Sequence, residues 1–465
     1  MASVVYAFVF ALFICSFLSV LSDRDLYSVY ASTDPEDEDE GPTIVEDPNL
    51  EAQLVFEGLD NPTNMAFLSK DDIVVLEKDK GTVQRIVDGE MLEQPLLDVD
   101  VANHAERGML GIAVARHLPA TYVFLYFTES SDEKDGSDEC ESRNHCTSGN
   151  PVGHRLYRYE LEDNKLINPK LLLDLPTNPG ADHVGGVIMA GPDNNIYLVT
   201  GDGDSCQKGC SDGIKDSVMY AQTANVKKGG SPQGRGGILR VTQDGEPVGR
   251  NGILGDKHPL DMYYAYGIRN SFGMEFDPVT GNLWDTENGP GFGDEINLVE
   301  PGFNSGWNKA QGMWPVTSYK QLDPTPKERG YLGEAEITSQ DEISKKLVVF
   351  NGNGSYSNPE LAWNISQGVT AIKFFNSDTL GEAYENDMFV GDVKSGNLYH
   401  FDLNEDRTRL ELGGRLHDKV ISSLEELDQI IFGKGFSAIV DIEVSPDGYL
   451  YILTYGGSIY RVVKD

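Results

Sequence analysis

A chain of 465 residues with 39% hydrophobic residues is long enough to bury a substantial core, which places it among globular proteins. Its formal net charge of −38, from 75 acidic and 37 basic residues, would repel a phosphate backbone and argues against nucleic acid as a partner. The 50 glycines and 21 tyrosines, with frequent turn-forming residues and little helical periodicity, predict many short strands and therefore the all-β class.

The amino end carries an uninterrupted apolar stretch over residues 4–21, VVYAFVFALFICSFLSVL. It predicts a signal peptide or a membrane anchor over residues 1–22, and either one implies export, to the outside of the cell or to the external face of its membrane. The like-charge run DPEDEDE at residues 34–40 predicts an acidic disordered spacer over residues 23–50. Residues 51–465 are then expected to form the folded domain.

A pattern of apolar strand, turn and second apolar strand recurs six times along the chain. The copies begin at Asn64, Gly108, Ala181, Ser271, Thr370 and Ala438. Several copies are followed by a further strand pair, so the repeating unit has about four strands, and such sheets repeated radially predict a six-bladed β-propeller. A pair of β-sandwich domains is the alternative, but it would not require six comparable units.

Four cysteines beyond the apolar leader form two close pairs, Cys140 with Cys146 and Cys206 with Cys210. In an exported chain they predict two local disulfides that pin long loops. Four thiolates could instead bind zinc, although the spacings CESRNHC and CQKGC are not the usual two-residue knuckles.

The third copy, ADHVGGVIMAGPDNNIYLVTGDGD at residues 181–204, has a histidine ahead of its first strand. Counting outward from the turn near Asp193 places His183 opposite positions 202–203, so His183 and Asp202 share the open end of this hairpin. A carboxylate beside an imidazole can hold one ring nitrogen as a donor and leave the other to accept a proton. The two residues are the predicted catalytic pair, and the alternative is a histidine that only satisfies loop backbone groups.

Polar residues of other copies are expected at the same face of the ring, because they also precede a first strand or follow a second one. These candidates are Glu106, Arg107, Arg269, Asn270, Gly289, Pro290 and Lys394. Arginine suits planar carboxylates, lysine supplies a point charge, and a Gly-Pro turn can aim carbonyls at a hard cation such as Ca²⁺. Convergence on one face predicts a functional site.

These segments resemble the PQQ-dependent soluble aldose sugar dehydrogenases, also called the glucose/sorbosone dehydrogenase family. The similarity runs from about residue 54 to residue 463, and it is carried by ERGMLGIAV, DHVGGVIMAGPDNNIYLVTGDGD, YGIRNSFG and ENGPGFGDEINLVEPGFNSGW. The family is a six-bladed propeller. The resemblance implies a quinoprotein that uses PQQ and Ca²⁺ to oxidise the anomeric carbon of aldose sugars to lactones and passes electrons to an external acceptor.

The resemblance also implies a role for each matched residue. His183 would remove the proton of the anomeric hydroxyl while hydride passes to PQQ, and Asp202 would orient His183 and help to hold the sugar. The carbonyls of Gly289 and Pro290 would bind the Ca²⁺ that polarises the quinone.

Further matched positions concern the cofactor and a second ion. Arg269, Asn270 and Lys394 match cofactor-binding positions, where positive charge would stabilise the reduced cofactor. Asp294 and Glu295, in GDEIN, match acidic residues that in some relatives bind a second, structural Ca²⁺.

The chain departs from the better-known glucose-oxidising members at two places. Those members supply two arginines from the start of the last blade, where this chain has Ala438 and Val440. Each missing contact would weaken PQQ binding by about 1.5 to 3 kcal/mol unless another cation replaces it. Glu106 stands where those members carry a glutamine, and its charge near an anionic cofactor needs Ca²⁺ or Arg107 to offset it.

Two other functions stay open at this point. A Ca²⁺-dependent propeller lactonase would also place calcium at the axis, but it needs side-chain carboxylates around the ion. A cofactor-less extracellular binding module agrees with Ala438 and Val440, whereas an intact set of His183, Asp202 and Arg269 disfavours it.

Overall fold

The computed structural model describes residues 43–465, except 118–119, 132, 137, 139–150, 178–179, 204–232, 317–338 and 351. The predicted leader, most of the predicted spacer and both predicted disulfides lie outside the described residues. Among the helices of the described part, none is long and apolar enough to cross a membrane.

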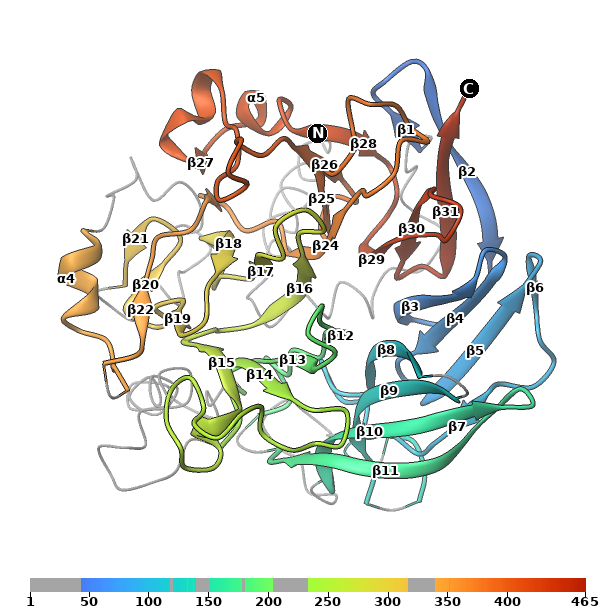
Figure 1. Cartoon of the computed structure of the whole chain (residues 1–465). Coiled ribbons are helices and arrows are strands. Elements are labelled where there is room, and N and C mark those ends of the chain that lie inside the picture. Colours follow the sequence, from blue (N-terminus) through green and yellow to red (C-terminus); the bar gives the residue numbers. More distant parts are fainter. Residues whose placement is uncertain are drawn as a thin grey trace, which may run out of the picture.

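Six sheets of four or more strands surround a common centre in the described part of the chain (Figure 1). The first holds β3 (Pro62–Ser69), β4 (Asp72–Glu77), β5 (Thr82–Val87), β6 (Glu90–Met91) and β7 (Leu97–Asp98). The second holds β8 (Met109–His117), β9 (Ala120–Glu129), β10 (Gly153–Glu162) and β11 (Lys165–Leu175). The third holds β12 (Ile188–Ala190), β13 (Ile196–Thr200), β14 (Gly237–Val241), β15 (Tyr263–Tyr266), β19 (Phe303–Asn304) and β22 (Ser355–Tyr356).

The remaining three sheets use the carboxyl-terminal half of the chain and its first described strands. The fourth holds β16 (Ser271–Phe276), β17 (Leu283–Glu287), β18 (Asp294–Val299), β23 (Leu361–Trp363) and β27 (Val420–Ile421). The fifth holds β24 (Val369–Phe374), β25 (Met388–Asp392), β26 (Leu398–Phe401), β28 (Ile431–Lys434) and β1 (Ile44–Val45). The sixth holds β29 (Ile439–Val444), β30 (Leu450–Thr454), β31 (Ser458–Lys464) and β2 (Leu50–Glu57).

Short elements decorate these sheets. They are the hairpin of β20 (Ala310–Gln311) and β21 (Trp314–Pro315), the helices α4 (Gln340–Ser344) and α5 (Leu424–Leu427), and the 3₁₀ helices η3 (Leu260–Met262) and η4 (Gly414–Asp418).

One edge strand of each sheet lies at the centre of the molecule. The strands β3, β8, β12, β16, β24 and β29 contact one another in this cyclic order, and β29 returns to β3. A closed ring of radially placed antiparallel sheets is a β-propeller, so the predicted all-β class and propeller arrangement are confirmed.

The two ends of the described chain close this ring. Strand β2 pairs antiparallel with β31, from Leu50 opposite Lys464 to Glu57 opposite Ser458. Strand β1 pairs with β28, with Ile44 opposite Lys434. The sheets therefore begin before residue 51, inside the predicted spacer, because these strands supply backbone partners to edges that would otherwise stay open.

Apolar cores fill the spaces between neighbouring sheets. Second strands such as β13 (IYLVT) and β30 (LYILT) are buried along their whole length, because both of their faces are covered by adjacent sheets. Between the second and third sheets, Phe124 and Leu156 join Leu198 and Leu239 in one buried cluster, and all four are fully buried.

We expect Phe124→Ala to lower the free energy of unfolding by about 3 to 5 kcal/mol, because the cavity lies between two sheets that cannot collapse onto it. Val279→Ala is the matched control, since Val279 is 58% exposed, and it should change stability by less than about 0.5 kcal/mol. Denaturant unfolding of both variants measures the difference, and equal midpoints would contradict this view of the core.

Candidate functional site

A cavity lies at the centre of the ring, where the innermost strands begin and the second strands end. Its wall includes Lys78, Glu106, His183, Arg269, Asn270 and Gly289. These residues come from the first four sheets and their connections, so segments far apart in the sequence meet here. Five of the predicted site residues lie on this wall.

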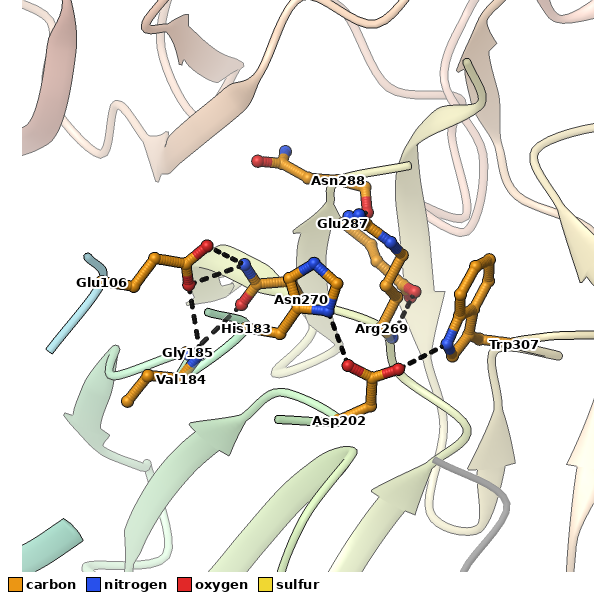
Figure 2. Close-up of polar contacts among 10 residues, drawn as sticks. All are labelled: Glu106, His183, Val184, Gly185, Asp202, Arg269, Asn270, Glu287, Asn288 and Trp307. Carbon is orange, nitrogen blue, oxygen red and sulfur yellow. Dashed lines mark hydrogen bonds and ion pairs between the residues drawn. The ribbon is translucent and has the colours of Figure 1, made fainter. Parts of the chain in front are cut away.

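His183 and Asp202 form the predicted pair (Figure 2). The imidazole Nδ1 lies 2.6 Å from Asp202 Oδ1. The carboxylate is buried, its Oδ2 accepts a hydrogen bond from the indole Nε1 of Trp307 at 2.7 Å, and its backbone N–H donates to the carbonyl of Arg269. Because Asp202 is fixed on both sides, it favours the tautomer with the proton on Nδ1, which leaves the lone pair on Nε2.

The backbone around His183 is held in an unusual conformation. His183 has a φ of 56°, in the left-handed region, and its carbonyl accepts a hydrogen bond from the N–H of Gly203. A Cβ on Gly201 would lie 2.2 Å from that carbonyl oxygen, so only glycine allows the two strand ends to approach this closely. The segment DHVGG is therefore shaped to present one side chain.

Glu106 and Asn270 clamp the same segment (Figure 2). The carboxylate of Glu106 accepts hydrogen bonds from the Val184 N–H at 3.1 Å and from the Asn270 amide at 3.0 and 3.1 Å. The Asn270 Oδ1 in turn accepts from the Gly185 N–H. Burial raises the pKa of Glu106, and the charge of His183 opposes that shift.

Arg269 crosses the cavity wall between the third and fourth sheets. Its Nη1 donates to the carbonyl of Asn288 at 2.9 Å, and its backbone N–H donates to Glu287 Oε1 at 2.7 Å. The guanidinium carbon lies 5.5 Å from the centre of the Trp307 ring. Trp307 thus contacts both Asp202 and Arg269, and sequence reasoning gave it no role although it ends the quoted motif GFNSGW.

Arg107 does not join the converging set. Its guanidinium is buried, pairs with Asp138 at 2.7 Å and donates to the carbonyls of Thr177 and Gly180. Glu106 lies on the cavity wall, whereas its neighbour Arg107 makes these contacts elsewhere and is not on the wall. Arg107 is therefore not placed to offset the charge of Glu106 at the cavity, as the sequence had suggested.

The lysines occupy different places from those expected. Lys394 is exposed, donates to the carbonyl of Ser366 at 3.2 Å and lies outside the cavity wall. Lys78, at the end of the second strand of the first copy, lines the cavity and is buried, with Nζ 2.7 Å from Asp79 Oδ1 and 3.1 Å from the carbonyl of Asn103. Lys394 was chosen because it follows the second strand of its copy. Lys78 in the segment VLEKDK also follows a second strand, so the same rule could have indicated it.

Asp294 organises the Gly289 turn. Its carboxylate accepts hydrogen bonds from the Gly289 N–H, the Ser366 hydroxyl and the backbone N–H groups of Gln367 and Gly368, at 2.6 to 2.9 Å. Four donors satisfy this carboxylate, so it acts as a positioning residue for the turn that contains Gly289 and Pro290. The predicted use of Asp294 as an ion ligand together with Glu295 is not supported by these contacts.

Glu295 faces the opposite side of β18 and joins a buried acidic cluster. Glu287 pairs with Glu295 and Asp285 with Asn297 across β17 and β18, so the four side chains share one sheet face. All four residues are buried. Burial raises the pKa of Asp285 to about 7 and that of Glu295 to about 8, because water is replaced by protein around each carboxyl group.

The comparisons with known proteins agree with this architecture. The model of the family "Glucose / Sorbosone dehydrogenase" matches residues 59–461. Aldose sugar dehydrogenase YliI of Escherichia coli is 24% identical over 408 residues, which cover 87% of this chain and 90% of that protein. Quinoprotein glucose dehydrogenase B of Acinetobacter calcoaceticus is 22% identical over 437 residues, which cover 87% and 85%.

Solved structures share the fold. The apo-form of the soluble aldose sugar dehydrogenase from Escherichia coli has a TM-score of 0.61 at 21% identity and covers 90% of this chain and 100% of that one. The PQQ-bound form of aldose sugar dehydrogenase from Streptomyces coelicolor has a TM-score of 0.58 at 20% identity and covers 90% and 98%.

The buried acidic cluster predicts an unusual pH dependence in the presence of a chelator. Carboxyls with folded-state pKa values near 7 and 8 keep their protons while the unfolded chain loses them, so their stabilising effect is complete below about pH 4 and is lost as pH rises towards 8. The free energy of unfolding of the wild type should therefore fall between pH 5 and pH 8. Asp285→Asn should make this fall smaller by about 1 to 4 kcal/mol.

The control for this measurement is Asp71→Asn, which removes an exposed carboxyl. Denaturant titrations at the two pH values give the difference for each variant. If Asp285→Asn and the wild type show the same change in the free energy of unfolding between the two pH values, Asp285 ionises normally in the folded protein.

Proposed function

This chain belongs to the Glucose / Sorbosone dehydrogenase family, and we propose that it oxidises the anomeric carbon of an aldose sugar to a lactone with PQQ as hydride acceptor and Ca²⁺ as Lewis acid. Membership makes it an oxidoreductase, a PQQ-dependent sugar dehydrogenase. We infer that each of the six sheets is one blade of a six-bladed propeller, and that residues 51–465 with the strands at 44–50 form this domain.

The observation that carries the proposal is the His183–Asp202 pair, in which His183 lies on the wall of the axial cavity and the buried Asp202 holds its Nδ1. With Nδ1 bonded to a buried carboxylate, the imidazole accepts a proton at Nε2 from the sugar hydroxyl and Asp202 stabilises the resulting charge. Trp307 keeps the carboxylate in place by its hydrogen bond to Oδ2. Glu106 and Asn270 fix the segment that carries His183, so the base does not have to be ordered during the reaction.

The residues on the cavity wall suit an anionic, planar cofactor. PQQ supplies a quinone that takes up the hydride when it is bound. On the wall, Arg269 and Lys78 offer cationic groups and Asn270 offers an amide. Lys394 lies outside the wall, but its flexible side chain could turn towards a carboxylate of the cofactor. Val440 lines the wall without a charge, so we propose Lys78 as the cation that replaces one of the missing arginines.

We propose two calcium sites at the fourth sheet. We assign the catalytic ion to the carbonyls of Gly289 and Pro290, whose turn Asp294 holds by accepting the Gly289 N–H. A structural ion would lie at Glu295 with Glu287, where buried carboxylates need compensating positive charge. We propose Glu287 in place of Asp294 in this second ligand set, because Asp294 already accepts four hydrogen bonds.

The proposal includes export and an external electron acceptor. The apolar segment at residues 4–21 supports export, as a signal peptide or as a membrane anchor. A Ca²⁺-dependent lactonase is disfavoured, because the carboxylates of Glu106 and Asp202 at the axis are bonded to protein donors. The uncharged Val440 on the cavity wall favours a binding module as the second candidate.

We expect the purified protein with Ca²⁺ and PQQ to reduce an artificial dye when aldoses are added. His183→Ala should lower kcat by about 10²- to 10⁴-fold because the general base is lost. His417→Ala, at an exposed histidine of η4, should keep the full rate. Absence of dye reduction over a broad panel of sugars would favour the binding module.

Lys78→Met should weaken the affinity for PQQ about ten-fold or more, since a charge-assisted contact with a carboxylate would be lost. Lys80→Met is the control, because the Lys80 side chain is 52% exposed and pairs with Asp60. Quenching of tryptophan fluorescence by PQQ measures both affinities. An equal Kd for the two variants would remove Lys78 from the cofactor site.

A further inference from the structure

A second cluster of ligand-type side chains lies on the fifth sheet, at the end remote from the axial cavity. Strand β25 ends at Asp392, next to Val393 of the cavity wall, and it begins at Met388, next to Asp387. Met388 pairs with Phe401 of β26, so Asp387 lies across from Asp402.

The same register brings a histidine to this place. His400 lies in β26 and Asp402 directly follows that strand, two residues later, so the two residues are on the same face. His400 Nε2 lies 2.9 Å from Asp387 Oδ2, and one ligand atom from each of Asp387, His400 and Asp402 lies within 4.8 Å of the others. We call these three residues the Asp-His-Asp cluster.

The imidazole of His400 is held rigidly. Its ring centre lies 5.1 Å from that of Phe389, 5.2 Å from that of Tyr384 and 6.3 Å from that of Phe432. Three aromatic neighbours limit the rotation of the ring, so a ligand at this position would not pay the full cost of ordering the side chain. The exposed Asp402 leaves the cluster open to solvent.

The cluster combines two carboxylates with one imidazole. One imidazolium can neutralise only one of the two carboxylates. A divalent cation would neutralise both and leave the imidazole neutral, which is the form that binds metals.

We propose that Asp387, His400 and Asp402 bind one divalent transition-metal ion of the zinc class. An imidazole nitrogen favours such ions over Ca²⁺ and Mg²⁺, which prefer oxygen ligands. Ligands about 2 Å from a common ion lie up to about 4 Å apart, so the cluster needs only small side-chain rotations. The ion would tie the connection before β25 to the end of β26, independently of the sugar site.

The test uses the full chain, treated with EDTA and then dialysed against excess CaCl₂ so that sites with oxygen ligands are filled. Calorimetric titration with ZnCl₂ at pH 7.5 should show a saturable site. Asp402→Asn, which changes an exposed group, and His400→Gln should each weaken this site at least ten-fold. His417→Gln, an exposed histidine outside the cluster, should leave it unchanged.

Circular dichroism confirms that each variant folds. Zinc binding that is equal in the wild type, Asp402→Asn and His400→Gln would place the ion elsewhere and overturn the proposal. Absence of a saturable zinc site in the wild type would also overturn it and would leave His400 and Asp387 as an ordinary hydrogen-bonded pair.

Discussion

Antiparallel pairing of β2 with β31 is the constraint on which the site depends. It joins residues 50–57 to residues 458–464 and so closes the ring of sheets with the two ends of the chain. A closed ring fixes the positions of the six innermost strands, which contact one another in sequence around the axis. Closure therefore delivers Lys78, Glu106, His183 and Arg269 to one cavity, although the first and the last are 191 positions apart in the sequence.

The site is assembled from groups that are costly to bury alone. Asp202 is 1% exposed, and it is tolerated because the imidazole, the Trp307 indole and the backbone carbonyl of Arg269 satisfy its side chain and its N–H. Leaving such a group unpaired would cost about 1 to 3 kcal/mol. The hydrogen bonds that make burial tolerable also fix the orientation of His183, so stability and preorganisation have the same origin here.

Strand periodicity explains what the sequence could predict. Counting from the turn at Asp193 placed His183 beside Asp202 correctly, because residues of a two-stranded ribbon have fixed partners. Neighbouring residues can still point to different surroundings, in the turn before β8 and along β18 alike. Arg107 sits next to Glu106 but serves other loops, and Asp294 sits next to Glu295 but faces the Gly289 turn.

Other features depended on contacts between distant parts of the chain. Trp307 reaches Asp202 across 105 positions, and no local pattern encodes that contact. The strand at residues 44–45 lies close to an acidic run that is typical of disorder, yet it pairs with Lys434 and Gly433 near the other end of the chain. The six repeated hairpins were visible because each is local, whereas their closure into a ring is not.

The most direct test of the proposed function is a calorimetric titration of the Ca²⁺-loaded wild-type protein with PQQ. We expect saturable binding of one PQQ per chain, because the cationic groups on the wall of the axial cavity face a single site. Absence of saturable uptake would contradict it, since a propeller that does not bind the quinone cannot use His183 and Asp202 to oxidise a sugar in this way.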